Sequence, residues 1–319
     1  MMHRKRKALW LIVAALSLLL CGCSNHPAGI DTVEHLIQEN DRVRENRAEP
    51  RVATALIAYN HFGMVGKSAT MIFNYLEETA TNLFMPINLI WRDEQVSGGE
   101  ALTYAQAMME NDRQFLMLYT PEMMVEELCA GQNTLESFSP VAMLAKEKIC
   151  FAVRGDSPYT DIKEIRRVAR TQQLNIGGLS VSGGMDEVRI QSFIGLESGA
   201  YQYHRMAPQE AVSGLLNGEV DLLCIPQSQA REALETGKIH AVSGICGDED
   251  LGMSWICLLA PKNMSESRIQ YWYQIFYDFS GSRLWQRTCV EEGWLCTYMY
   301  GETLTAFLLQ QRETLGKLL

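Results

Sequence analysis

Positive charge is scarce in this sequence, which has 28 Lys and Arg residues against 38 Asp and Glu. Four of the basic residues form one cluster, Arg4 to Lys7, and without it 24 basic residues face 38 acidic ones, a formal charge of −14. Nucleic-acid binding requires a basic surface, and so does electrostatic adhesion to anionic lipid. The charge balance therefore argues against a nucleic-acid partner, and any attachment to a membrane needs a lipid anchor.

The cysteines do not follow a metal-binding pattern. No Cys-X-X-Cys pair and no Cys/His pair has the spacing of a metal site. Cys150, Cys224 and Cys257 lie in apolar runs, so we expect them to be buried as small hydrophobic residues. Cys289 and Cys296 are close enough in sequence for a local disulfide, although we expect two free thiols. We predict no metal and no cofactor.

Catalytic and nucleotide-binding motifs are also missing. No Ser/His/Asp spacing stands out, and His61 and His204 have no partner pattern that supports catalysis. Gly66-Lys67-Ser68 invites a P-loop interpretation, but His61 stands where that motif needs its first glycine. We therefore expect neither an enzyme nor a nucleotide site.

The apolar run Ala8 to Leu20 is too short for a comfortable membrane span, which takes about 20 residues. Together with the basic cluster before it, the run predicts a secretory signal over residues 1–22. Leu20-Cys21-Gly22-Cys23 then resembles the bacterial lipobox, in which Cys23 would be lipidated. Cys21 is unusual before the glycine, and a plain signal peptide with a chance cysteine is the alternative. We expect a membrane-anchored, extracytoplasmic lipoprotein with a polar tether up to residue 50.

The body of the chain alternates strand-like and helix-like segments. About 270 residues remain after the tether, which suffices for one large or two medium domains. The alternation predicts parallel βαβ units with ligands at the carboxyl ends of the strands. Residues 138–153 look like a strand pair that enters a second lobe, and we expect the remainder after Pro261 to be helical, over 265–279, 282–292 and 302–318. The other predicted strands are 52–59, 87–91, 115–119, 201–205, 220–225, 239–245 and 253–261, and the other predicted helices include 69–79, 121–128, 161–171, 209–216 and 228–236.

The chain is organised around Leu174 to Phe193, which combines a short apolar strand, a Gly/Ser loop and a helix-like pattern. Free amides at a helix N-terminus bind anions, and glycines let the backbone approach a ligand. An ordinary strand-to-helix turn is the alternative. Residues 60–69 read as a second amide-rich loop, with Ser68 as a helix cap and Lys67 either adding positive charge for an anion or simply solvated.

Several segments fall in an order and at spacings that are together specific. They are Phe138-Ser139-Pro140-Val141-Ala142, Leu174-Asn175, residues 215–222, Gly237-Lys238-Ile239, Ser254-Trp255 and residues 258–261, with Gly98-Gly99 and Asp112 at matching positions. With them, residues 52–319 resemble the substrate-binding proteins of tripartite tricarboxylate transporters.

This resemblance implies a two-lobed α/β fold of the periplasmic-binding-protein type II, with mostly parallel sheets flanked by helices and a ligand cleft between the lobes. We place lobe 1 at 51–148 and 249–319, and lobe 2 at 149–248. The resemblance further implies a monomer that closes over a small organic carboxylate and delivers it to a two-component integral membrane permease.

In the family, backbone amides of two facing loops hold the substrate carboxylate. Here these loops would be residues 62–68 and 180–186. The expected ligand-binding residues are Phe62, Gly63, Gly66, Lys67, Ser68, Thr120, Ser180, Val181, Ser182, Gly183, Gly184, Met185, Asp186, Arg205, Pro226 and Trp255.

The sequence also departs from the family. Lys67 stands in a loop that usually ends with an acidic group, Asp186 stands where many members have His, and Ile225-Pro226 replaces an Asp-Asn pair. The segment before the Ser-Trp strand is shortened to residues 247–252. These changes keep the scaffold and leave the ligand open.

Individual side chains have competing interpretations. Arg205 could grip a distal carboxylate or lie on the surface. Asp186 could receive a ligand hydroxyl or ammonium, or stabilise its own helix, which we favour. Trp255 could line the cleft or lie in the core, and Asp221 suits a structural role. A ligand-sensing lipoprotein that signals through a partner, and an enzyme on the same fold, are the alternative functions.

Overall fold

The computed structural model describes residues 54–59, 61–83, 87–91, 98–110, 114–197, 199–244 and 250–319. The predicted signal, Cys23 and the tether lie outside these ranges, as do Asp112 and residues 247–249. The elements below belong to the compact unit Asn46–Leu319. No helix within the described ranges has both the length and the apolar character to cross a membrane.

The first sheet begins with the predicted strand–helix alternation. Strands β1 (Thr54–Ala58), β2 (Ile87–Trp91) and β3 (Phe115–Tyr119) are parallel, with β1 in the middle. Helices α3 (Gly63–Leu83) and α4 (Gly98–Glu110) connect them. After β3 come α5 (Pro121–Cys129) and the short α6 (Thr134–Ser137). The expected βαβ units are confirmed.

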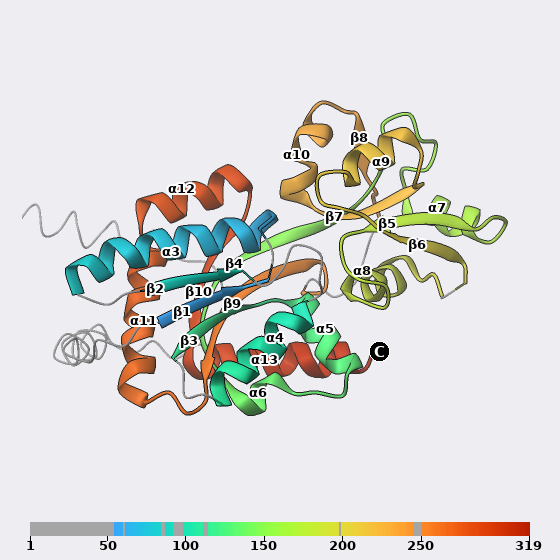
Figure 1. The fold of residues 1–319 in the computed structure, drawn as a ribbon. Helices are drawn as coiled ribbons and strands as arrows, with labels where there is room; N and C mark the ends of the chain where they lie inside the picture. The colour runs from blue at the N-terminus through green and yellow to red at the C-terminus, as the bar shows by residue number, and fades with distance from the viewer. Residues whose placement is uncertain are drawn as a thin grey trace, which may run out of the picture. The chain divides into compact units, whose positions relative to one another are not determined.

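One long strand, β4 (Phe138–Arg154), links the two lobes. Residues up to Lys148 pair antiparallel with β9 (Met253–Pro261), whereas Ile149 onward pairs with β7 (Leu222–Pro226) and β8 (Ile239–Ala241). The prediction of a strand pair is therefore wrong. The chain runs through the middle of β4 without a break, from one sheet to the other (Figure 1).

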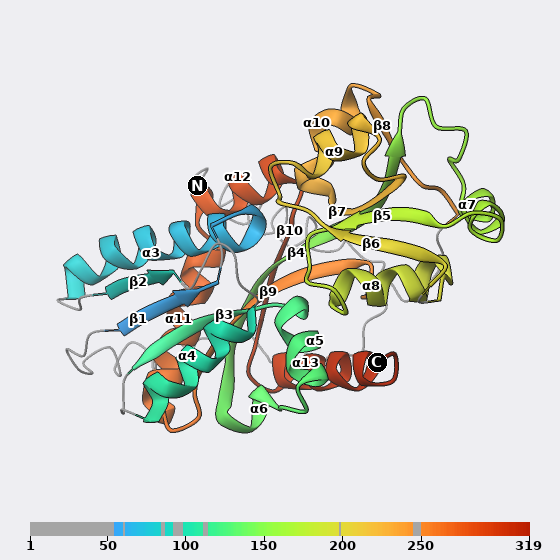
Figure 2. The same ribbon diagram turned by 45° about the vertical axis from the view of Figure 1, so that its right-hand side comes forward.

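The second sheet contains the strand that leads into the predicted Gly/Ser loop. Strand β5 (Leu174–Gly178) lies parallel between β6 (Tyr201–Arg205) and β7. Figures 1 and 2 show this group of elements apart from the first sheet, with β4 running between the two. The helices of this lobe are α7 (Ile162–Ala169), α8 (Met185–Arg189) with a π-helical continuation (Ile190–Ile194), α9 (Ala211–Asn217) and α10 (Gln227–Glu235).

The C-terminal part returns to the first lobe. It contains α11 (Glu266–Ser280), α12 (Arg283–Glu292), β10 (Leu295–Tyr300) and α13 (Gly301–Gly316). The three expected helices are confirmed, but a helical remainder overlooked β10, which lies between the last two of them and pairs antiparallel with β4. Its aromatic-rich sequence suits a strand, and Gly293 ends the preceding helix in a left-handed conformation at φ 71°.

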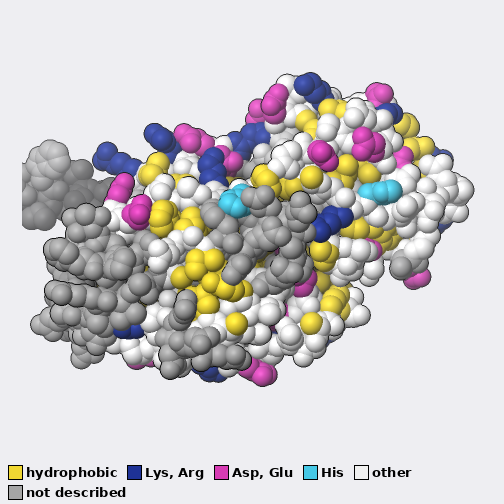
Figure 3. All heavy atoms as spheres, viewed as in Figure 1, with side chains coloured by type: hydrophobic (Ala, Val, Ile, Leu, Met, Phe, Trp, Pro, Cys, Tyr) yellow, Lys and Arg dark blue, Asp and Glu magenta, His cyan; other side chains and the backbone are white. Residues whose placement is uncertain are grey.

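Helices cover both faces of the first sheet, and alternate strand residues face opposite ways. Leu56 packs with Ile72 and Phe276 of α3 and α11, whereas Ile57 packs with Leu102 and Leu304 of α4 and α13. Cys150, Cys224 and Cys257 are buried free thiols, as predicted, and Cys289 and Cys296 are free as well. The face drawn in Figure 3 carries acidic and basic side chains side by side.

Helix α3 starts six residues earlier than predicted, so Gly66-Lys67-Ser68 is helix and not loop. The Gly66 N–H donates to the Phe62 carbonyl at 3.0 Å, and a Cβ on Gly66 would lie 2.1 Å from the backbone C and O of His61. The chain folds back so closely over Gly66 that only glycine fits. Ser68 is fully buried inside the helix, and the prediction that it caps the helix is wrong.

Replacement of Gly66 by alanine should destabilise the fold. The added methyl group meets backbone that cannot move away, so we expect the free energy of unfolding to fall by about 1–3 kcal/mol and the melting temperature by roughly 2–12 °C. Gly316→Ala is the matched control, because its Cβ would meet nothing nearer than Leu128 Cδ2 at 3.8 Å. Equal melting temperatures for the two variants would contradict this account of Gly66.

Candidate functional site

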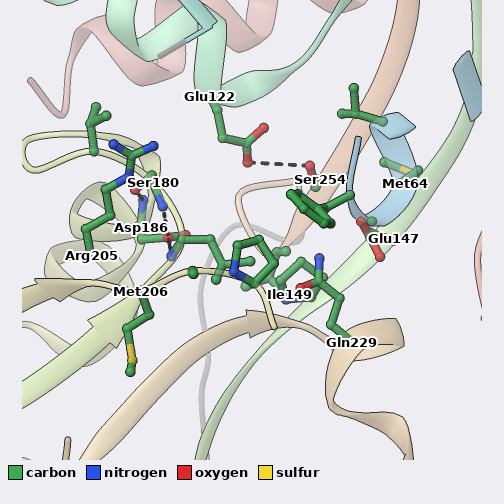
Figure 4. A pocket seen from close by; sticks show the side chains of 18 of the residues that line it. Met64, Glu122, Glu147, Ile149, Ser180, Asp186, Arg205, Met206, Gln229 and Ser254 are labelled. Atoms are coloured by element: carbon green, nitrogen blue, oxygen red, sulfur yellow. Dashed lines mark hydrogen bonds between the residues drawn. The ribbon is translucent and has the colours of Figure 1, made fainter. Parts of the chain in front are cut away.

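A cavity of about 400 Å³ lies between the two lobes, at the carboxyl ends of the parallel strands (Figure 4). Its lining comes from the segments after β1 and β5, the N-terminal parts of α3, α5, α8 and α10, the end of β6 with residues 206–209, the end of β7, the middle of β4 and the start of β9. Ligands of open α/β sheets bind at such strand ends. The position of the cavity therefore makes it the candidate binding site.

Both predicted loops reach the cavity. The first loop lines it with its beginning, which includes the predicted Phe62 and Gly63, and the second loop lines it with Ser180 and Val181 at one end and Asp186 at the other. Two further residues from the predicted set, Arg205 and Pro226, line the cavity at the ends of β6 and β7. The structure thus brings these residues of two distant sequence regions together around one space.

The remaining predicted site residues lie outside the cavity lining. Lys67 is half-exposed and forms an ion pair with Glu292 of α12. Trp255 is 1 % exposed and packs against Tyr119 and Phe307 in the core. Thr120 lies behind the wall, with its hydroxyl 3.3 Å from the Tyr59 hydroxyl. The others outside the lining are Gly66, Ser68, Ser182, Gly183, Gly184 and Met185.

The loop after β5 binds a side-chain carboxylate of the protein. Asp186 Oδ2 accepts hydrogen bonds from the backbone N–H groups of Leu179 at 2.7 Å and Ser180 at 2.9 Å. A Cβ on Gly178 would lie 2.7 Å from the same oxygen, so the glycine leaves room for the carboxylate. Farther along, Glu187 accepts from the Gly183 N–H at 2.8 Å. These amides, which we expected to hold a substrate, bind carboxylates of the protein instead.

Arg189 neutralises Asp186 and ties the lobes together. Its side chain is 1 % exposed, and Nη1 lies 3.2 Å from Asp186 Oδ1 and 3.4 Å from Glu122 Oε1 of α5. Nε donates to the Leu251 carbonyl at 3.1 Å and Nη2 to the Met253 carbonyl at 3.4 Å. Burial opposes the charge of this guanidinium, but Glu122 and Asp186 outweigh burial and raise its pKa. Sequence reasoning missed Arg189, although its spacing of three from Asp186 on a helix was a usable signal.

Glu147 is a buried carboxylate in the cavity wall, also missed from the sequence. It is 4 % exposed, and its Oε2 accepts a hydrogen bond from Ser228 Oγ at 2.6 Å. Burial raises its pKa to about 7; the negative charge of Glu122 adds to this, whereas Ser228 and Arg189 oppose it. A glutamate between two lysines in a strand-like run does not by itself indicate a binding site. The strand period predicts only that it faces the other way from the two lysines.

Negative charge predominates among the described residues that line the cavity. Their ionisable acids and bases are Glu122, Glu126, Glu147 and Asp186 against Arg189 and Arg205. Tyr59 shows the effect: burial raises its pKa well above the usual range, and Glu122, Glu126 and Glu147 each raise it further. In the described part of the chain, no group of three His, Cys, Asp or Glu side chains could hold a metal ion.

Glu147→Gln should stabilise the ligand-free protein, and increasingly so at higher pH. The native pKa of about 7 exceeds the ordinary 4.5, so the native state holds the proton more tightly than the unfolded chain and loses stability as pH rises between these values. Glutamine cannot ionise and still accepts from Ser228. We expect melting curves of variant and parent to be close at pH about 5 and well separated at about 8.

Glu235→Gln, at an exposed position on α10, is the control for this series and should follow the parent protein at every pH. A Glu147→Gln effect that does not change with pH would show that Glu147 ionises normally in the folded state.

A scan against protein-family models gives no match, and a search of curated proteins gives no relative. Solved structures do share the fold. A TctC solute-binding protein from Polaromonas is 13% identical with a TM-score of 0.64, covering 85% of this chain and 98% of that one. MatC from Rhodopseudomonas palustris with bound malate is 15% identical with a TM-score of 0.64, covering 84% and 98%.

A third solved structure, Rpa4515 of R. palustris with adipate, is 17% identical with a TM-score of 0.66, covering 85% of this chain and 97% of its own. At such identities the likeness concerns the fold. The family resemblance seen in the sequence is confirmed at that level: the chain has the two-lobed α/β fold of the TctC solute-binding proteins.

Proposed function

We propose that the protein is an extracytoplasmic, lipid-anchored solute-binding protein, not an enzyme, that captures a small organic carboxylate and delivers it to a two-component membrane permease. The observation that carries this proposal is the cavity at the strand ends between two lobes, with an arginine at its edge. Structures of the same fold with bound malate and adipate support a carboxylate as the ligand class.

Several contacts between the lobes are polar. Arg189 bonds Glu122, Ser228 bonds Glu147, and Arg231 of α10 donates to the Glu291 carbonyl at the end of α12. Such groups can exchange their partners for water when the lobes part. A ligand that contacts both lobes would favour the closed state through its own binding energy. The proposed boundary at 148/149 coincides with the place where β4 changes partners from β9 to β7, whereas 248/249 lies outside the described residues.

Arg205 is the residue we propose for the carboxylate. The guanidinium of Arg189 donates its hydrogen bonds to Asp186, Glu122 and two backbone carbonyls, all within the protein. Arg205 stands exposed at the end of β6 and lines the cavity from the second lobe. A guanidinium can hold a carboxylate by two parallel hydrogen bonds.

Arg205→Gln should weaken carboxylate binding. Loss of a charged hydrogen bond of about 1.5–3 kcal/mol corresponds to roughly a 10- to 100-fold rise in Kd. Ligands are first identified by thermal shift with malate, succinate, adipate, citrate, tricarballylate and glutamate. A ligand at a hundred times its Kd adds about 2.7 kcal/mol to stability. Calorimetric titration of the hit then compares parent, Arg205→Gln and the control Arg170→Gln, exposed at the end of α7.

Unchanged affinity in Arg205→Gln would remove Arg205 from the site. No thermal shift with any of these acids, in protein shown by native mass spectrometry to be free of bound ligand, would overturn the proposed function.

Cys23→Ala should release the protein from the membrane. If Cys23 carries the lipid, its loss should abolish incorporation of radiolabelled palmitate and move the protein into the soluble fraction. Cys21→Ala is the matched control and should leave both unchanged. Continued membrane association of the Cys23→Ala variant after a salt and carbonate wash would contradict the lipid anchor.

A further inference from the structure

Charge in the cavity does not match a ligand that is only an anion. Asp186 and Arg189 form a buried pair 3.2 Å apart, and each has its remaining hydrogen bonds within the protein. With that pair set aside, the charged side chains of the described lining are Glu122, Glu126 and Glu147 against Arg205. A dicarboxylate would bring two more negative charges to a wall that is already acidic.

Glu147 has no ion-pair partner among the described residues. It lies 96 % buried, and in the described part of the chain no Lys or Arg forms an ion pair with it. The lysines on either side do not serve, because alternate residues of a strand face opposite ways. Lys146 lies over the Phe307 ring and 3.5 Å from Asp250, and Lys148 is exposed. Burial of a carboxylate without a counter-charge is costly, so its place in a cavity wall points to a cation that arrives with the ligand.

A neighbouring acceptor also lacks a donor. Gln229 lines the cavity one residue after Ser228, the hydrogen-bond partner of Glu147, and its Oε1 is buried with no donor in the described structure. An ammonium group has three N–H donors and no acceptor. The oxygens of Glu147, Gln229 and Glu122 are the acceptors such a group requires.

The two kinds of charge lie apart. Figure 4 shows Arg205 on one side of the cavity and Glu147 with Gln229 on the other, with Glu122 reaching in from α5 between them. A molecule that spans this space can therefore place an anionic end at Arg205 and a cationic end at the glutamates.

We propose that the ligand is zwitterionic, an amino acid or another small amino-carboxylic acid, with its ammonium held by Glu147, Glu122 and Gln229 and its carboxylate by Arg205. This assignment rests on the proposed binding function and narrows its substrate class.

Proton linkage fits this arrangement. Glu147 is faced by Glu122 from α5, Arg189 from α8 and Ser228 from α10, and its pKa of about 7 leaves it partly protonated at neutral pH. An ammonium favours the ionised carboxylate, so its binding should release protons from Glu147 near pH 7. A purely anionic ligand should instead take protons up.

The test uses matched pairs of probes with the full chain purified in detergent: glutamate with glutarate, aspartate with succinate, and 2-aminoadipate with adipate. Each pair differs in the ammonium group alone. Calorimetry in two buffers of different ionisation enthalpy gives both Kd and the protons exchanged. We expect the amino member of at least one pair to bind tenfold or more tightly than its partner, with proton release at pH 7.

Glu147→Gln should remove that preference, raising the Kd of the amino acid at least tenfold while leaving the plain dicarboxylate unchanged or improved. Glu235→Gln, exposed on α10, is the control, and a melting curve establishes that each variant is folded. Glu122→Gln is a second variant and should also raise the Kd of the amino acid.

Tighter binding of the plain dicarboxylates, or proton uptake on binding, would overturn the zwitterion while leaving carboxylate capture intact. Binding of 1,4-diaminobutane in preference to every acid would also overturn it. Failure of every acid, amino or plain, would instead overturn the proposed function itself.

Discussion

The buried guanidinium of Arg189 determines how the site is arranged. Burial of an unpaired charge would be prohibitive, and the fold meets the requirement with two carboxylates and two backbone carbonyls. One of these carboxylates, that of Asp186, lies close over Gly178 and accepts hydrogen bonds from backbone amides of the loop after β5. The other, Glu122, belongs to the opposite lobe. The same interaction therefore rigidifies the loop, joins the lobes and removes amides from the set that a ligand could use.

Strand β4 adds the second constraint. Its register against β9 is irregular before Ala145 but regular from there to Lys148, so the strand period of two divides the polar stretch at its centre between opposite faces. Glu147 faces the cavity, and both neighbouring lysines face away. A turn at this point, which a strand pair would need, would have separated the register of the second lobe from that of the first. The continuous strand instead fixes Glu147 opposite Ser228 of α10.

Local pattern was enough to predict the strand–helix alternation, the loop after β5, the buried cysteines and the start of α7 at Asp161, whose side chain accepts from the Lys163 N–H. It failed where long-range packing decides. Strand β10 exists because the edge of β4 is open to it, and α3 begins at Gly63 because the chain folds over Gly66. The site shows the same limit: Glu147 meets Ser228 across 81 positions and Arg189 meets Glu122 across 67. No spacing rule connects such partners.

A scaffold of this kind can change its ligand without changing its fold. The apolar core is built from sheet faces that pack against helices, and those faces are separate from the charges at the strand ends. One carboxylate at position 186 is enough to occupy a loop that would otherwise present its amides to an anion. Because those amides are already hydrogen-bonded to the protein, the choice of ligand depends on side chains of the other walls. The charged side chains there are mostly acidic. Backbone geometry thus preserves the cavity, while a few charged side chains determine which end of a ligand each wall accepts.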